Sequence, residues 1–297
     1  MSMFKKTTLA LAISALAGGA LAQSAPAPAL APAPATSPIT ANVTVTNDYR
    51  YRGISQSNFK PAIQGGFDYA HESGFYIGNW NSSISWISDY YSSNGAGGQG
   101  ASVTAPVEMD FYAGFKKELI APGFASDIGV LQYWYPTSGL PIGNSNSTGV
   151  ANPNTTEAYI AQNFTFGSLT GFVKVSYAMT TLFGNVDSQG SYYPDLTINY
   201  DTGVYGLTLN GHIGYQYVAG QNPTTPLASN STLYSYTDWK LGITKDFGGG
   251  LSLAVAYVGT NAAQTVRVGS TSYNAYKSPQ NKNLGQGGGL ISLTKTF

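Results

Sequence analysis

The chain has 297 residues, with 14 Lys and Arg against 14 Asp and Glu, so its formal net charge is zero at pH 7. This balance argues against nucleic acid as a partner, because no basic excess is available to neutralise phosphates. Charged residues make up 9% of the chain, whereas ordinary soluble domains contain about 25%. The absence of Cys excludes a disulfide scaffold and any thiol metal site.

The first 22 residues have the pattern of a secretory signal peptide. Lys5 and Lys6 precede an apolar run at residues 9–16, and small residues lead up to Ala22. The apolar run is too short to span a bilayer as a helix. We therefore predict export through the secretory pathway, with cleavage after Ala22.

The next segment, residues 23–39, alternates Pro and Ala with little other chemistry. Such a composition cannot bury a core and favours a stiff, extended, disordered linker. The remaining residues, 40–297, are of a size for one all-β domain.

From residue 40 onward, apolar and polar side chains alternate with a period of two, which places them on opposite faces of a strand. In the first segment, Val43, Val45 and Tyr49 oppose Asp48 and Arg50. The facing is less clear in the third and fifth segments. The pattern predicts twelve strands, at residues 40–52, 62–71, 74–86, 107–118, 124–135, 156–166, 169–180, 193–201, 204–217, 234–246, 250–260 and 288–297.

The connections between these segments are alternately short and long. Gly-containing turns, which supply the positive φ angles of tight hairpins, occur at residues 71–74, 120–123, 166–168, 201–203 and 247–250. Longer polar stretches occupy residues 88–106, 136–155, 219–233 and 261–286, with a shorter one at 53–61.

An even number of strands joined in this way is typical of a bacterial outer-membrane barrel. Repeated alternation also fits a soluble β-sandwich. Scarce charge and aromatic clusters at strand ends, such as Tyr133-Trp134-Tyr135, favour the barrel, because aromatic girdles mark its two lipid interfaces. We predict a transmembrane antiparallel up-and-down β-barrel with short periplasmic turns and longer extracellular loops.

The last predicted strand ends on an aromatic residue. Ile291, Leu293 and Phe297 share one face, a pattern that resembles the C-terminal signal read by the barrel-insertion machinery. Lys295 departs from that pattern, although near the membrane edge its amine can reach water. Outer-membrane lipid and the insertion machinery are therefore the expected partners of a protein in the Gram-negative outer membrane.

Several motifs resemble those of one family, Gcw_chp, a family of exported proteobacterial proteins also labelled TorF family porins. The resemblance implies an outer-membrane location more strongly than an activity, because the porin label is itself inferred. Its specific part is N-terminal, and weaker similarity extends over nearly the whole mature chain. The motifs are Asn47-Asp48-Tyr49-Arg50-Tyr51-Arg52-Gly53-Ile54-Ser55-Gln56-Ser57, Pro61-Ala62-Ile63-Gln64-Gly65-Gly66-Phe67-Asp68-Tyr69, Gly74-Phe75-Tyr76-Ile77-Gly78-Asn79-Trp80, Glu108-Met109-Asp110-Phe111 and the closing Thr294-Lys295-Thr296-Phe297.

Ionised side chains on the lipid face near the bilayer midplane cost about 2–4 kcal/mol each for Lys or Arg, so they belong in a hydrated interior. Arg50 and Arg52 would there bind a carboxylate or phosphate on a solute, or form ion pairs across neighbouring strands, with Asp68 as one partner. The side chains expected to line a pore are Asp48, Arg50, Arg52, Gln64, Asp68, Glu108, Asp110, Lys116, Lys174, His212 and Lys240.

Three functions remain open at this point. The first is a porin or channel for passive diffusion of a small hydrophilic solute. The second is a non-conducting barrel whose extracellular loops contact partners. The third is a lipid hydrolase, for which His212 is the only candidate base on a strand. No nucleophile motif, phosphate loop or metal spacing supports catalysis, so we expect no enzyme activity and no cofactor.

Overall fold

The computed structural model describes residues 37–91, 102–140, 151–222 and 228–297. The predicted signal peptide, residues 1–22, and nearly all of the predicted linker lie outside the described residues. Among those described, no helix combines the length and apolar character needed to cross a membrane.

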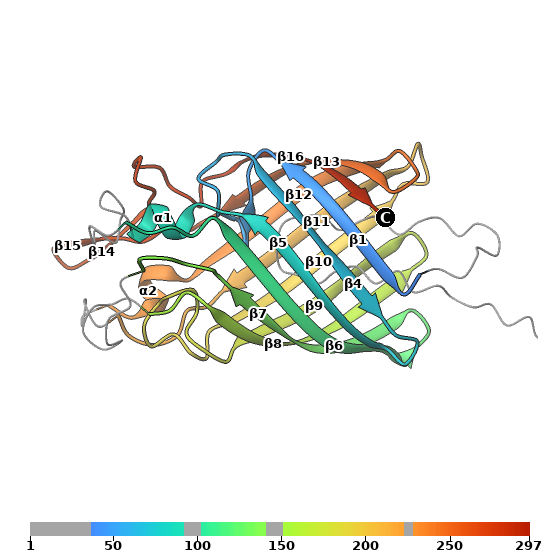
Figure 1. Cartoon of the computed structure of the whole chain (residues 1–297), viewed down its shortest axis with the longest axis horizontal. Coiled ribbons are helices and arrows are strands. Elements are labelled where there is room, and N and C mark those ends of the chain that lie inside the picture. The colour runs from blue at the N-terminus through green and yellow to red at the C-terminus, as the bar shows by residue number, and fades with distance from the viewer. Residues whose placement is uncertain (1–36, 92–101, 141–150, 223–227) are drawn as a thin grey trace, which may run out of the picture.

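Twelve antiparallel strands close into a single barrel (Figure 1). Each strand pairs with its neighbour in the chain, and β1 closes the sheet by pairing with both β4 and β16. The barrel strands are β1 (Ile39–Thr46), β4 (Ala62–Ala70), β5 (Phe75–Ser83), β6 (Val107–Ala121), β7 (Phe124–Trp134), β8 (Thr155–Phe166), β9 (Leu169–Ala178), β10 (Tyr192–Asp201), β11 (Leu207–Gln216), β12 (Tyr236–Asp246), β13 (Leu251–Thr260) and β16 (Gly288–Thr296).

The predicted number of strands, their order and the alternation of short turns with long loops are confirmed. Short turns gather at the end where the chain terminates, and long connections gather at the other end (Figure 1). At the β6–β7 turn, Gly123 has a φ of +83°, and a Cβ there would lie 2.8 Å from the carbonyl oxygen of Thr165. Glycine is therefore required for this turn to close.

The long-loop end carries small elements that alternation could not reveal. They are α1 (Trp86–Tyr91), α2 (Asn230–Tyr234), a hairpin formed by β14 (Thr265–Val268) and β15 (Thr271–Asn274), and a short hairpin formed by β2 (Arg50–Tyr51) and β3 (Ile54–Ser55). In Figure 1, α1, α2 and β14–β15 extend beyond the barrel mouth.

The outside of the barrel is apolar around its circumference. Ile63, Ile128, Ile160 and Leu241 are each at least 60% exposed, although they lie within β4, β7, β8 and β12. A soluble protein would bury such side chains, whereas a barrel in lipid presents them to hydrocarbon.

The same burial pattern establishes the facing of the two strands that alternation left uncertain. On β5, Phe75 and Ile77 are exposed while Tyr76 and Trp80 are buried. On β7, Ile128, Val130 and Trp134 are exposed, and the alternate side chains, Asp127 among them, are buried. Both strands therefore direct large apolar side chains outward and a mixed face inward, although Asn79 and Asn81 of β5 share the outward phase.

Candidate functional site

Charged side chains from β4, β6, β9, β11 and β12 line the inside of the barrel. Because side chains on a strand alternate between its two faces, β6 directs Glu108, Asp110 and Lys116 inward while Phe111 and Phe115 face out. The same alternation places Gln64 and Asp68 of β4, Lys174 of β9, His212 of β11 and Lys240 of β12 on the inside.

Asp48, Arg50 and Arg52 reach the interior by a different route from the one predicted. The first strand ends at Thr46 instead of continuing to residue 52, and residues 47–61, here called the inward segment, fold into the barrel. Arg52 and Gly53, with φ of +45° and +77°, form the tight turn between β2 and β3. The inward segment starts at β1 and makes contacts with β8 and β11, on the opposite side of the sheet order.

The predicted strand 40–52 has Tyr49 and Tyr51 in phase with Val43 and Val45 and would turn both rings toward lipid, which the structure contradicts. Both rings are buried, at 0% and 7% exposure. Tyr51 donates or accepts a 2.8 Å hydrogen bond with the hydroxyl of Tyr133 on β7, and Tyr49 donates to Glu108 on β6. These polar partners inside the barrel stabilise a position that a continued strand would not allow.

Each arginine of the inward segment is paired with an acid. Arg50 Nε lies 2.5 Å from Asp48 Oδ2, and Arg52 donates to both oxygens of Glu157 at 3.0 and 2.7 Å. The predicted pairing with Asp68 is contradicted, because Asp68 instead accepts a 2.5 Å hydrogen bond from Tyr112. The arginines already have carboxylate partners, so they are not free to bind an anionic solute.

Tyrosines position several of the inward acids. Tyr112 lies over Gly78 of the neighbouring strand, where a Cβ would come within 2.5 Å of the ring. With its ring held against the wall, the Tyr112 hydroxyl reaches across β5 to Asp68 of β4. Tyr159 similarly lies over Gly129 and hydrogen-bonds to Tyr76, which donates to Asp127 at 2.7 Å.

The remaining inward acids differ in the number of hydrogen bonds that their carboxylates accept. Glu108 accepts hydrogen bonds from Tyr49 and Tyr135, whereas neither carboxylate oxygen of Asp110 has a hydrogen-bond partner among the described residues. His212 lies between Asp238 and Asp195, with ring nitrogens 2.9 and 3.1 Å from their carboxylates.

The inward lysines make fewer polar contacts. Lys116 donates to Asn163 at 3.1 Å, and the Lys174 amine lies over the rings of Tyr159 and Phe172. Apart from Glu118, Asp201 and Asp246 at the strand ends beside the short turns, the described residues direct eight acidic and six basic side chains into the barrel. The acids are Asp48, Asp68, Glu108, Asp110, Asp127, Glu157, Asp195 and Asp238, and the bases are Arg50, Arg52, Lys116, Lys174, His212 and Lys240.

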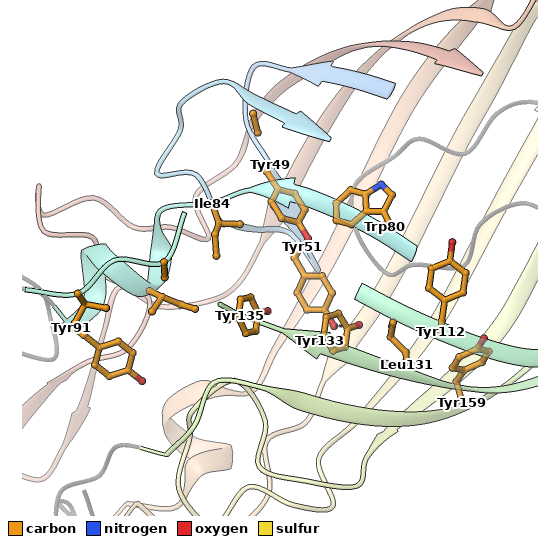
Figure 2. Close-up of a cluster of buried hydrophobic side chains, with 14 of the residues drawn as sticks. Tyr49, Tyr51, Trp80, Ile84, Tyr91, Tyr112, Leu131, Tyr133, Tyr135 and Tyr159 are labelled. Atoms are coloured by element: carbon orange, nitrogen blue, oxygen red, sulfur yellow. Dashed lines mark hydrogen bonds between the residues drawn. The ribbon is translucent and has the colours of Figure 1, made fainter. Parts of the chain in front are cut away.

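Aromatic rings from the inward segment pack against aromatic rings from the barrel wall. We call the cluster of Tyr49, Tyr51, Trp80, Tyr133 and Tyr135 the tyrosine plug. Figure 2 shows these side chains converging from the inward segment, β5 and β7 and the residue after it. The rings of Tyr49 and Trp80, and those of Tyr51 and Tyr133, meet edge to face with centroids 5.5 Å apart. The plug fills part of the barrel interior on the long-loop side.

Uncharged polar side chains also line the interior beside the plug, where Ser82 pairs with Glu108 in register. Thr44 and Thr294 share a 2.8 Å hydrogen bond between hydroxyls, and Gln64 donates to Ser82 at 3.2 Å. These four side chains are buried even though they face the inside of the barrel. Charged side chains continue toward the short turns, where Asp68 of β4, Lys116 of β6 and Asp127 of β7 face inward.

Above the plug lies a cavity of about 420 Å³ at the barrel mouth. Its lining comes from the inward segment, α1, α2, the 182–186 connection and the loop that carries β15. Tyr51 and Tyr135 of the plug form part of it. We call this cavity the vestibule.

A closed sheet that is apolar outside and polar inside defines the class of this protein, a transmembrane β-barrel. The sequence matches the family model described as bacterial protein of unknown function (Gcw_chp) over residues 31–297. The chain belongs to this family, as the motifs predicted. No curated protein matches the chain in sequence.

Comparison with solved structures finds distant likenesses to outer-membrane barrels. A NanC porin structure is 9% identical, with a TM-score of 0.48, over 87% of this chain and 98% of that one. A KdgM porin is 8% identical, with a TM-score of 0.46 and the same coverage. A FadL homologue from Pseudomonas aeruginosa is 11% identical, with a TM-score of 0.43, over 87% and 90% of the two chains. These distant likenesses concern the barrel alone and say nothing about a solute.

Proposed function

We propose that this protein is a narrow channel for passive diffusion of small hydrophilic solutes across the outer membrane. The observation that carries the proposal is the enclosure of a charged and hydroxyl-rich inner wall by an apolar exterior. A charged side chain enclosed by an apolar barrel costs free energy unless water or an opposite charge surrounds it. A hydrated path through the barrel supplies that water.

The inward segment would determine what passes. The tyrosine plug restricts the cross-section, so only small solutes and ions fit. Both of its arginines are neutralised by Asp48 and Glu157, and acids outnumber bases on the inner wall. We therefore expect cations to be preferred over anions, in contrast to what a free pair of arginines would produce.

The proposal also includes a location in the outer membrane and export through the secretory pathway. Ile291 and Leu293 are about half exposed on the outside of β16, and Phe297 is exposed at the end of the chain. This supports contact with outer-membrane lipid and recognition of the last strand by the insertion machinery. Export through the secretory pathway rests on the N-terminal sequence alone.

Planar-bilayer recordings of the purified protein test the channel. We expect small discrete conductance steps that favour cations. Replacing the two plug tyrosines of the inward segment, Tyr49→Ala with Tyr51→Ala, should enlarge the steps, because the cross-section at the plug limits the current. The matched control is Tyr205→Ala, since that ring is 83% exposed at a short turn far from the plug and its loss should leave conductance unchanged.

A second function, a non-conducting barrel that acts through its extracellular loops, is favoured by the packing of the interior. Glu108, Asp110, Glu157 and Asp238 are each at most 2% exposed, so their surroundings leave little space for water. The same recordings separate the two functions. Silent insertion of both the wild type and the double variant, each shown to be folded by its heat-modifiable gel mobility, would contradict the channel and leave the loop function.

A further inference from the structure

The vestibule has two properties that bear on the solute. Its volume of about 420 Å³ falls within the roughly 300–1,000 Å³ of small-molecule sites. It is closed below by the plug, so a solute approaching from the long-loop side reaches it before the constriction.

The vestibule lining is rich in aromatic rings held at fixed angles. Trp86 meets Tyr135 edge to face at 5.5 Å, and Tyr90 meets Tyr91 in the same way at 4.7 Å. On the far side, Tyr276 packs against Tyr236 at 5.1 Å. Such rings offer electron-rich faces to the weakly positive C–H groups of a ligand.

Polar groups that could orient a ligand lie between the rings. Asn58 Oδ1 and Trp86 Nε1 are buried and have no hydrogen-bond partner in the described parts of the chain. Tyr90 and Tyr91 line the same cavity and add hydroxyls that can both donate and accept. Because a buried donor or acceptor without a partner costs free energy, Asn58 and Trp86 favour a ligand that supplies both donors and acceptors.

Little charge is present in the vestibule. Among the described residues that line it, Asp89 and Lys277 are the only ionised side chains, and Asp89 already accepts hydrogen bonds from Ser85 and Asn58. Burial raises the pKa of Tyr90 and Tyr91, so their hydroxyls stay neutral. The described lining therefore offers an anionic ligand one lysine and no arginine, and it offers a cationic ligand one carboxylate that already accepts two hydrogen bonds.

We infer that the vestibule is a binding site for a neutral mono- or disaccharide. A sugar ring presents C–H groups on its faces and hydroxyls at its edge, and each hydroxyl both donates and accepts. A sugar therefore fits the vestibule, in which aromatic rings alternate with amide, indole and phenol groups. A purely apolar ligand fits less well, because it would leave those polar groups unpaired. The inference rests on the proposed function for its purpose, since binding here would concentrate the solute above the constriction.

Calorimetric titration of the folded protein in detergent micelles tests the site without requiring conductance. The probes are the neutral disaccharides maltose, cellobiose, lactose and sucrose, with digalacturonic acid and adenosine as the anionic and the aromatic alternative. We expect saturable binding of at least one neutral disaccharide. Trp86→Ala should weaken that binding roughly tenfold or more by removing a ring face and a donor. Trp134→Ala is the matched control, because Trp134 lies on the outside of the barrel.

Tyr91→Phe provides the second variant, since it removes only a hydroxyl and preserves the packing of α1. It should weaken binding several-fold while the heat-modifiable mobility stays that of the wild type. The inference is overturned if no neutral disaccharide binds, if digalacturonic acid or adenosine binds instead, or if neither variant changes the affinity. Conductance without saccharide binding would refute this site alone, whereas saccharide binding without conductance would refute the channel alone.

Discussion

Arg52→Ala is expected to reduce the free energy of unfolding by about 3–5 kcal/mol, the cost of removing one partner from a buried ion pair. Glu157 is 2% exposed and would lose both of its hydrogen bonds from Arg52. Gln216 would lose a 2.5 Å contact, and the ring of Tyr193 would lose the guanidinium 4.2 Å from its centroid. The carboxylate of Glu157 would remain buried without a counterion.

Urea unfolding of the barrel in lipid vesicles measures this loss. Arg267→Ala is the matched control, because Arg267 is exposed in β14, and its removal should change stability by no more than about 0.5 kcal/mol. Adding Glu157→Gln to Arg52→Ala should recover part of the stability, since it removes the uncompensated charge. Equal stability of the Arg52→Ala and Arg267→Ala variants would show that the inward segment does not bind Glu157.

Leu241→Arg is the second substitution with a large expected effect. Leu241 is 71% exposed at the middle of β12, so the new charge would face hydrocarbon and cost about 2–4 kcal/mol of stability in a bilayer.

The control for this substitution is Tyr205→Arg at a short turn, where a charge near the membrane interface costs about 0–1 kcal/mol. Both variants are compared by urea unfolding in vesicles of the same lipid. If the two substitutions have the same cost, the middle of β12 does not lie in hydrocarbon.

The barrel was predictable because its signal is repeated and local. In β12, Trp239, Leu241 and Ile243 alternate with Lys240 and Thr244. Each such strand can be predicted from its own residues, without knowing which strands it pairs with. Short turns containing glycine mark where the chain reverses. Strand ends were predicted within a few residues, except at residue 46.

That exception shows what periodicity cannot detect. Tyr49 and Tyr51 continue the alternation of β1, so the pattern alone extends the strand across them. Their true position depends on Glu108 and Tyr133, more than fifty residues away in the chain. Gly53 and the dense charge around it were the local sign that the strand stops.

The inward facing of the strand side chains was predictable from the sequence, but the way they pair was not. Alternation placed Glu108, Lys174 and His212 on the inner face, yet the partner of a charge depends on how the inward segment folds across the barrel. Asp127 was missed because the facing of β7 was ambiguous. Tyr112 shares the phase of Glu108 and Asp110, so the same rule could have identified it as an inward residue.

The account depends most directly on which side chains of β12 face lipid. The chain has no native Cys, so single Cys at residues 239–244 can each carry a nitroxide spin label in reconstituted vesicles. We expect collisions with oxygen, which concentrates in hydrocarbon, to be frequent at 239, 241 and 243 and rare at 240, 242 and 244. Loss of this two-residue period, or preferential collision of the odd positions with a water-soluble nickel chelate, would contradict a barrel embedded in a membrane.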